Sequence, residues 1–398
     1  MKFISTFLIY TILVFSSCQE SQDSLSANSK VELGSNFNHN PEIIDFHYLE
    51  KAEVDWIRTT PYIFEYIFGL RDVSSEQGLQ KLIDAGIKGY KIAFGFRWDF
   101  KKHNIDVPAA GSKEESQYFS VALEILEKVG PHVDVLKLGN EPILETKAKD
   151  KKIGVGGKIP LIEFTKRLLS EVVEPYYLNH PEFHLPDIYV GSIHALFSDV
   201  VQSDEATNGL IRFAQESETI TGLSMHLHIS ELSEIEEAFK YVRTIMPEKP
   251  IIVPEFSLHR LYKSQLSDQI GSTDKGMEFA KQFNRNPDWR LYDWYSLSNS
   301  VGVSSEEWQA LFESRSWFPK HYMRTYFNMF KKYGVRLATY PLLQQYCPDT
   351  VTEKSSAWFI NPIFCQKSLE KNPNGRYSAN PLCFNDFVEL VRDGKLIE

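Results

Sequence analysis

Two glutamates, Glu141 and Glu255, each follow a hydrophobic run that ends at a proline-containing motif. The runs cover residues 133–138 and 251–253, and the motifs that close them are Asn-Glu-Pro and Pro-Glu-Phe. Continuous apolar runs of this length are typical of strands buried in a parallel sheet. Two carboxyl groups delivered to one edge of such a sheet can cleave a glycosidic bond. One protonates the leaving oxygen, while the other attacks or assists on the opposite side of the sugar.

The rest of the chain alternates strand-like and helix-like segments joined by short connections, which is the pattern of βα units. Besides the two runs that end in Glu141 and Glu255, we predict strands at residues 31–37, 54–59, 88–96, 187–194, 221–229 and 335–343. Helices are predicted at 43–52, 74–85, 114–129, 161–173, 210–216, 232–245, 304–333 and 385–391. Eight strands in this order predict a single (β/α)8 barrel over residues 31–398. Active sites of that fold lie at the carboxyl ends of the strands.

With eight strands counted, Glu141 falls at the end of strand 4 and Glu255 at the end of strand 7. The motifs Asn140-Glu141-Pro142 and Pro254-Glu255-Phe256 resemble those of the retaining (β/α)8 glycoside hydrolases called clan A. The resemblance implies that Glu141 is the general acid/base, that Glu255 is the nucleophile and that Asn140 donates to the sugar 2-hydroxyl.

The segment 138–142 also resembles the strand-4 motif of the heparanase-like β-glucuronidases and of some arabinofuranosidases. Those families usually add a β-sandwich, for which this chain has no room after its barrel. We therefore assign the clan and no named family.

A retaining mechanism constrains the surroundings of both carboxyl groups. Glu141 must begin protonated, so we expect apolar neighbours and the charge of Glu255 to raise its pKa. Glu255 must stay ionised, which requires nearby donors, and Arg58 at the end of strand 2 is the first candidate. Either glutamate alone is better explained as a solvated loop carboxylate. The pair at matching strand ends favours catalysis.

His226 and His228 share one face of strand 6, because side chains alternate along a strand. We expect them to contact the substrate or the nucleophile. The alternatives are hydrogen-bonded core histidines or a metal pair with His194.

Several further residues are candidates for substrate binding. Arg97 and Trp98 follow strand 3, where the indole could stack on a sugar ring or simply pack the loop. Trp294 and Tyr340 are weaker candidates of the same kind. The long segment 258–303 is expected to shape the substrate cleft.

The amino terminus resembles a bacterial lipoprotein signal. Met1-Lys2 precedes an apolar run at residues 3–15 and then Ser16-Ser17-Cys18. We expect a signal peptide at 1–17, a lipidated Cys18, and a flexible tether at 18–30 that leads to the barrel. The protein would then be exported and anchored at the cell envelope, with the lipid as its membrane contact. An ordinary signal peptide cleaved elsewhere is the alternative.

Composition restricts the possible partners. The net charge of −10 argues against nucleic acid, and we expect a monomer that acts on carbohydrate without a cofactor. In an exported protein, one disulfide among Cys347, Cys365 and Cys383 is expected. The chain has no C-x-x-C pair, which argues against a structural zinc site.

Two other classes of function remain open. A surface glycan-binding protein could use the same barrel without turnover, although it would not need both carboxylates. A metal-dependent enzyme could use Glu141, Glu255, His226 and His228, although no ladder of Asp, Glu or Lys accompanies strands 5 and 6.

Overall fold

A computed structural model describes residues 30–395 of the chain. The expected signal peptide, Cys18 and all of the tether except residue 30 lie outside the described residues. Within 30–395, none of the helices combines the length and the apolar character needed to cross a bilayer.

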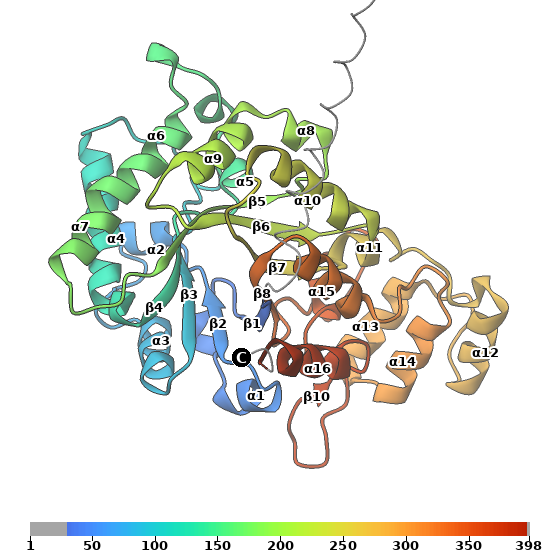
Figure 1. Cartoon of the computed structure of the whole chain (residues 1–398). Helices are drawn as coiled ribbons and strands as arrows, with labels where there is room; N and C mark the ends of the chain where they lie inside the picture. The colour runs from blue at the N-terminus through green and yellow to red at the C-terminus, as the bar shows by residue number, and fades with distance from the viewer. Residues whose placement is uncertain (1–29, 396–398) are drawn as a thin grey trace, which may run out of the picture.

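Eight parallel strands close into a barrel in chain order, and the predicted (β/α)8 fold is confirmed (Figure 1). The strands are β1 (Glu32–Asn36), β2 (Trp56–Thr59), β3 (Lys91–Gly95), β4 (Val133–Lys137), β5 (Asp187–His194), β6 (Gly222–His228), β7 (Ile251–Ser257) and β8 (Val335–Pro341). Strand β1 pairs with both β2 and β8, and the pairing of Glu32 with Leu337 begins the seam that closes the barrel. Because helices cover the outside and side chains fill the inside, the strands are buried on both faces and are accordingly apolar.

Helices surround the barrel in the same chain order. They are α1 (Phe46–Lys51), α2 (Ile63–Ile67), α3 (Gln77–Ile87), α4 (Lys113–Val129), α5 (Pro142–Glu145), α6 (Pro160–Arg167), α7 (Glu174–Asn179), α8 (Asp199–Gln202), α9 (Glu205–Glu216), α10 (Ser233–Ile245), α11 (His259–Ser264), α12 (Asp274–Gln282), α13 (Leu291–Val301), α14 (Ser305–Glu313), α15 (Tyr322–Lys332) and α16 (Phe384–Lys395). Residues 168–173 continue α6 into α7 as a π-helical turn.

Capping explains where two of the main helices begin. The side chain of Ser112 accepts a hydrogen bond from the backbone N–H of Glu115 at the start of α4, and Asp204 does the same for Thr207 in α9.

The prediction of one continuous helix at 304–333 was wrong, because this segment forms two helices, α14 and α15. The chain breaks between α14 and α15, where Pro319 removes a backbone donor and His321 adopts a left-handed φ of 56°. The break lets α15 cross the outside of the sheet. There, the Tyr326 hydroxyl donates to the carbonyl oxygens of Leu227 at 3.0 Å and Ser257 at 2.9 Å.

The long segment 258–303 folds into α11, α12 and α13 and packs with α14 beside the barrel (Figure 1). Trp294 Nε1 and Arg285 Nε both donate to Glu307 Oε1, at 2.8 and 2.7 Å. The chain after β8 carries a small antiparallel pair, β9 (Phe364–Cys365) and β10 (Ser378–Ala379), before α16.

Cys347, Cys365 and Cys383 are all free thiols, so the expected disulfide is absent. Two of these thiols have polar partners of their own: Cys347 Sγ lies 3.9 Å from Ser368 Oγ, and Cys383 Sγ lies 3.8 Å from the carbonyl oxygen of Pro362.

The barrel interior changes character along its axis. A cluster of buried side chains from β2, β3, β4, β5, β7 and β8 fills the inside, namely Trp56, Ala93, Val135, Tyr189, Ile252 and Leu337. Two residues further along β2 and β4, on the same inward face, stand Arg58 and Lys137, both fully buried. The apolar layer therefore supports a polar layer at the carboxyl ends of the strands.

Candidate active site

Glu255 lies near the end of β7 and is 8% exposed. Arg58 Nη1 donates to its Oε1 at 2.5 Å, and His228 Nε2 lies 3.4 Å from its Oε2. Burial by itself would raise the pKa of Glu255. The charges of His226 and Arg58 and the contact with His228 outweigh burial and hold that pKa well below its usual value. Glu255 is therefore ionised at neutral pH.

Arg58 connects three strand ends through one planar guanidinium group. Besides Glu255, it donates from Nη1 to Asn36 Oδ1 at 2.9 Å and from Nη2 to Asn140 Oδ1 at 2.7 Å. A guanidinium group suits this position because its donors are fixed in a rigid fork. The orientation of the Asn140 amide is thereby set, with Nδ2 directed away from Arg58.

Glu141 occupies a strained backbone position at the N-terminus of α5. Its φ and ψ are 39° and 47°, in the left-handed region that costs a non-glycine residue on the order of 1–3 kcal/mol. Pro142 begins the helix at once, with a fixed φ suited to that first position. Strained residues of this kind cluster at functional sites.

The expectation of a raised pKa for Glu141 was wrong. Burial and the charge of Glu255 do raise it, but the hydrogen bond and charge of His226, with the charge of His228, lower the pKa to about 2. The reason is a contact between strands that are far apart in the sequence: His226 Nδ1 lies 3.2 Å from Glu141 Oε1.

The imidazole ring of His226 spans the two carboxylates. Its Nε2 lies 3.7 Å from Glu255 Oε1, on the other side of the ring from Glu141. His226 is fully buried, and burial is the main cause that lowers its pKa to about 4, so the ring is neutral at pH 7. One side chain therefore bridges the carboxylates at the ends of β4 and β7.

A third carboxyl group, Glu145, was not anticipated. It lies four residues after Glu141, one helical turn along, and its Oε1 accepts from Asn140 Nδ2 at 3.2 Å. Arg97 Nε lies 2.7 Å from the same oxygen. Burial raises the pKa of Glu145 to about 8, against the opposing charge of Arg97. The i, i+4 spacing from Glu141 was the available signal.

Trp98 is buried and exposes no ring face to a sugar, so the stacking interpretation was wrong. The indole is 5% exposed and packs among Phe100, Phe164 and Tyr118, with an edge-to-face contact of 5.1 Å to Phe164. The alternative, that it packs the loop after β3, is the correct one.

Trp294 and Tyr340 are also removed from the site, because both are fully buried in other layers. Trp294 is fixed by its bond to Glu307 in the α13–α14 layer. The Tyr340 hydroxyl lies 2.9 Å from that of Tyr322, and its ring packs on Phe256. Alternation along β8 turns Tyr340 outward.

An aromatic side chain that the sequence did not single out, Trp358, lies beside the histidines. Its ring stacks on His259 with centroids 3.6 Å apart and planes at 2°, and it meets the His228 ring edge-on at 4.8 Å. Trp358 is half-buried. It comes from the Asn- and Pro-rich segment after β8, where the only signal was a single tryptophan without a periodic pattern.

A second half-buried ring, Tyr62, lies on the Arg97 side. The Arg97 guanidinium carbon is 4.5 Å and Lys102 Nζ is 4.0 Å from its centroid. Both cations contact the ring face by cation–π attraction. Trp358 therefore contacts His228, which lies beside Glu255. Tyr62 contacts Arg97, which lies beside Glu145.

Three ligating side chains stand close enough to bind a metal ion. One ligand atom each from Glu141, His226 and His228 lies within 4.8 Å of the other two. The expectation that the protein needs no cofactor remains a prediction.

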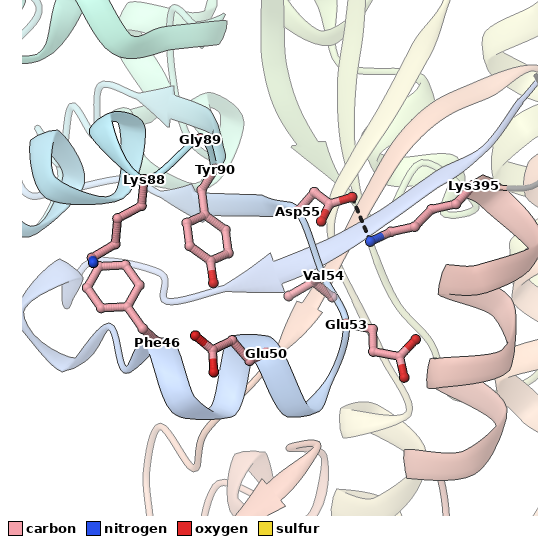
Figure 2. A pocket seen from close by; sticks show the side chains of 9 residues that line it. All are labelled: Phe46, Glu50, Glu53, Val54, Asp55, Lys88, Gly89, Tyr90 and Lys395. Carbon is pink, nitrogen blue, oxygen red and sulfur yellow. Dashed lines mark ion pairs between the residues drawn. The ribbon is translucent and has the colours of Figure 1, made fainter.

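A separate hollow of about 430 Å³ lies on the opposite face, between the loops that precede β2 and β3 (Figure 2). Lys88 and Tyr90 line one side, and an ion pair of 2.7 Å between Asp55 and Lys395 closes the other. Asp55 precedes β2, and Lys88 and Tyr90 precede β3, so the hollow belongs to the amino-terminal end of the barrel.

No protein-family model matches the chain, and no curated protein matches it either. Solved structures with similar folds include an endo-β-1,6-glucanase, at 11% identity and a TM-score of 0.50 over 92% of this chain and 77% of that one. A psychrophilic family 10 endo-β-1,4-xylanase aligns at 11% identity and 0.46, over 94% and 98%. A GH5-4 broad-specificity endoglucanase from Clostridium longisporum aligns at 9% identity and 0.49, over 95% and 99%. The expected likeness to clan A barrels, without a named family, is confirmed at the level of fold.

Proposed function

We propose that the chain is a retaining glycoside hydrolase that uses Glu255 as nucleophile and Glu141 as general acid/base. The observation that carries the proposal is the single His226 ring, which lies 3.2 Å from one carboxylate and 3.7 Å from the other. Two carboxyl groups that contact the same ring, at the carboxyl ends of β4 and β7, can act on the same sugar ring.

In the first step Glu255 attacks the anomeric carbon while Glu141 gives its proton to the leaving oxygen. In the second step Glu141 removes a proton from water, which displaces Glu255 from the sugar. Arg58 supports this role of Glu255, because its short bond to Oε1 keeps the carboxylate ionised and fixed before the attack.

The protonation of Glu141 depends on the substrate. The contact with His226 lowers the pKa of Glu141 and keeps it ionised. A sugar that displaces this contact removes the hydrogen bond that lowers the pKa of Glu141, while burial and the charge of Glu255, which raise that pKa, remain. We infer that substrate entry prepares the acid, and that Asn140 donates its remaining Nδ2 hydrogen to the sugar 2-hydroxyl.

Aromatic rings on both sides of the carboxylates support a carbohydrate substrate. The Trp358 ring stacks on His259, and the Tyr62 ring is held by Arg97, Lys102 and His39. The Asn140 amide, held by Arg58 and Glu145, supplies a directed donor between them.

The contact of Glu141 with His226 at 3.2 Å, which lowers the pKa of the glutamate, favours a second candidate, a glycan-binding protein without turnover. Such a protein would retain the aromatic platforms and would never need a protonated Glu141.

Turnover of neutral, uronic and sulfated polysaccharides by wild type, Glu141→Gln and Glu255→Gln distinguishes the two candidates. Glu231→Gln, at an exposed position after β6, is the control. Cleavage of one glycan by wild type and the control, lost in both site variants, supports the hydrolase. Tight binding of one glycan without cleavage by wild type supports the binding protein.

We also propose that the protein is a lipoprotein, on the strength of the Ser16-Ser17-Cys18 motif alone. Metabolic labelling with a radioactive fatty acid tests this, since Cys18→Ser should abolish the label. A label that persists in that variant would contradict it.

A further inference from the structure

The buried ring of His226 presents an unpartnered nitrogen to a carboxylate. A carboxylate only accepts hydrogen bonds, so Nδ1 of His226, beside Glu141, carries the ring hydrogen. The lone pair of Nε2 then faces Glu255 Oε1 at 3.7 Å, and Nε2 has no hydrogen-bond partner among residues 30–395. Arg58 already donates to this oxygen at 2.5 Å, so the group without a partner is the Nε2 lone pair, which a metal ion can accept.

The second imidazole, His228, approaches the same carboxylate. His226 and His228 lie two residues apart on β6 and so share one face. His228 Nε2 is 3.4 Å from Glu255 Oε2, and its Nδ1 is 2.8 Å from Ser257 Oγ. A metal-binding histidine usually has its other nitrogen held by such a polar partner, which fixes the ring.

We propose that this cluster is a binding site for a Zn²⁺-like transition-metal ion, held by His226, His228 and carboxylate oxygens of Glu141 and Glu255. Two imidazoles with carboxylate oxygens form a donor set that Zn²⁺ binds well. Ca²⁺ and Mg²⁺ prefer oxygen ligands alone, so the two imidazoles select against them.

The spacing of the donors fits such an ion. Metal–ligand bonds of about 2.0–2.2 Å put two ligands of a tetrahedral ion about 3.3–3.6 Å apart. The distance from His228 Nε2 to Glu255 Oε2, 3.4 Å, lies in that interval, and His226 Nε2 lies 3.7 Å from the other carboxylate oxygen, Oε1. Glu141 is within 4.8 Å of both histidines, and its side chain, 17% exposed, can complete the set by a rotamer change.

The consequence for activity rests on the proposed function. An ion held by Glu141 and Glu255 occupies the oxygens that must carry the proton and attack the sugar. The bound metal therefore inhibits hydrolysis, and a chelator restores it.

Isothermal titration of the full chain with ZnCl2 tests the binding without any substrate. Wild type should bind one Zn²⁺ at this site, and His228→Asn should weaken the binding at least 100-fold. His180→Asn is the matched control, because His180 also lies beside a carboxylate, 3.1 Å from Glu182, but at the surface. It should bind Zn²⁺ as wild type does.

A second variant keeps the test independent of folding. His226→Asn should lose the site as well, and circular dichroism reports whether each variant is folded. Equal Zn²⁺ affinity in wild type and a folded His228→Asn would overturn the proposal, as would no binding by wild type.

A hydrolysis assay separates this proposal from the proposed function. If wild type binds Zn²⁺ but cleaves no polysaccharide, with or without chelator, the result would contradict the proposed hydrolase and support the metal site. Polysaccharide cleavage that requires Zn²⁺ would overturn the inhibitory role. Cleavage that EDTA enhances and Zn²⁺ suppresses, in wild type and in His180→Asn alike, is the expected result.

Discussion

Arg58 donates a 2.5 Å hydrogen bond to Glu255 from a position with no solvent exposure. The guanidinium reaches Glu255 across the barrel from β2 to β7. It is the main fixed positive charge that compensates the Glu255 carboxylate, which is itself almost completely buried. The pair therefore couples the stability of the barrel to the chemistry proposed for it.

Replacing Arg58 by Met should destabilise the fold by about 3–5 kcal/mol, because it leaves Glu255 buried without its charge partner. Urea denaturation measures the change. The double variant Arg58→Met with Glu255→Gln removes the unpaired charge and should recover a large part of the loss. A double variant no more stable than the single one would contradict this account of the pair.

Trp98→Ala and Trp358→Ala should have opposite effects. Trp98 is enclosed by aromatic rings, so its truncation should cost about 3–5 kcal/mol of stability with little change in KM for the folded enzyme. Trp358 is half-buried beside the site, so its truncation should raise KM with a smaller loss of stability. Denaturation curves and steady-state kinetics on one substrate measure both. Equal KM for the Trp358 variant and wild type would remove it from the binding site.

Stability should fall as the pH is lowered through the range in which His259 is protonated in the unfolded chain and neutral in the folded chain. Burial is the main cause that lowers the pKa of His259 to about 3, from an ordinary value of about 6.5. Between pH 6.5 and 3 the unfolded chain binds a proton that the folded chain does not, so stability decreases as pH falls through that interval.

His259→Phe keeps a ring against Trp358 and removes the titration. The melting temperature of this variant should decline less than that of wild type between pH 7 and 4. His184→Phe, at an exposed position, is the control. An identical decline in wild type and His259→Phe would show that this ring does not contribute.

Most of the strands were predictable because they carry their own signal. β3, β4, β5, β7 and β8 each contain consecutive apolar residues, whereas β1 (ELGSN) and β2 (WIRT) carry a weaker signal and follow from the order of the elements. Glu141 and Glu255 were identifiable because each lies in a short motif at the carboxyl end of an apolar run, Glu141 just after β4 and Glu255 near the end of β7. The position of Arg58 at the end of β2 followed from the strand assignment as well.

Contacts between distant segments could not be read in this way. The pKa of Glu141 depends on a ring delivered by β6, and the sequence shows neither the tautomer nor the distance. Trp358 comes from a segment without periodicity. The stacking prediction for Trp98 failed because the aromatic rings that enclose it include Tyr118 of α4 and Phe164 of α6, which lie far from it in the sequence.

The account of the site rests on a covalent intermediate at Glu255, and the configuration of the first product tests it most directly. A polysaccharide that wild type cleaves should be followed by proton NMR in the first minutes, before mutarotation. We predict that the new reducing end keeps the anomeric configuration of the bond that was cut. An inverted product would mean that water attacks the sugar directly, and Glu255 would then be a base and not the nucleophile.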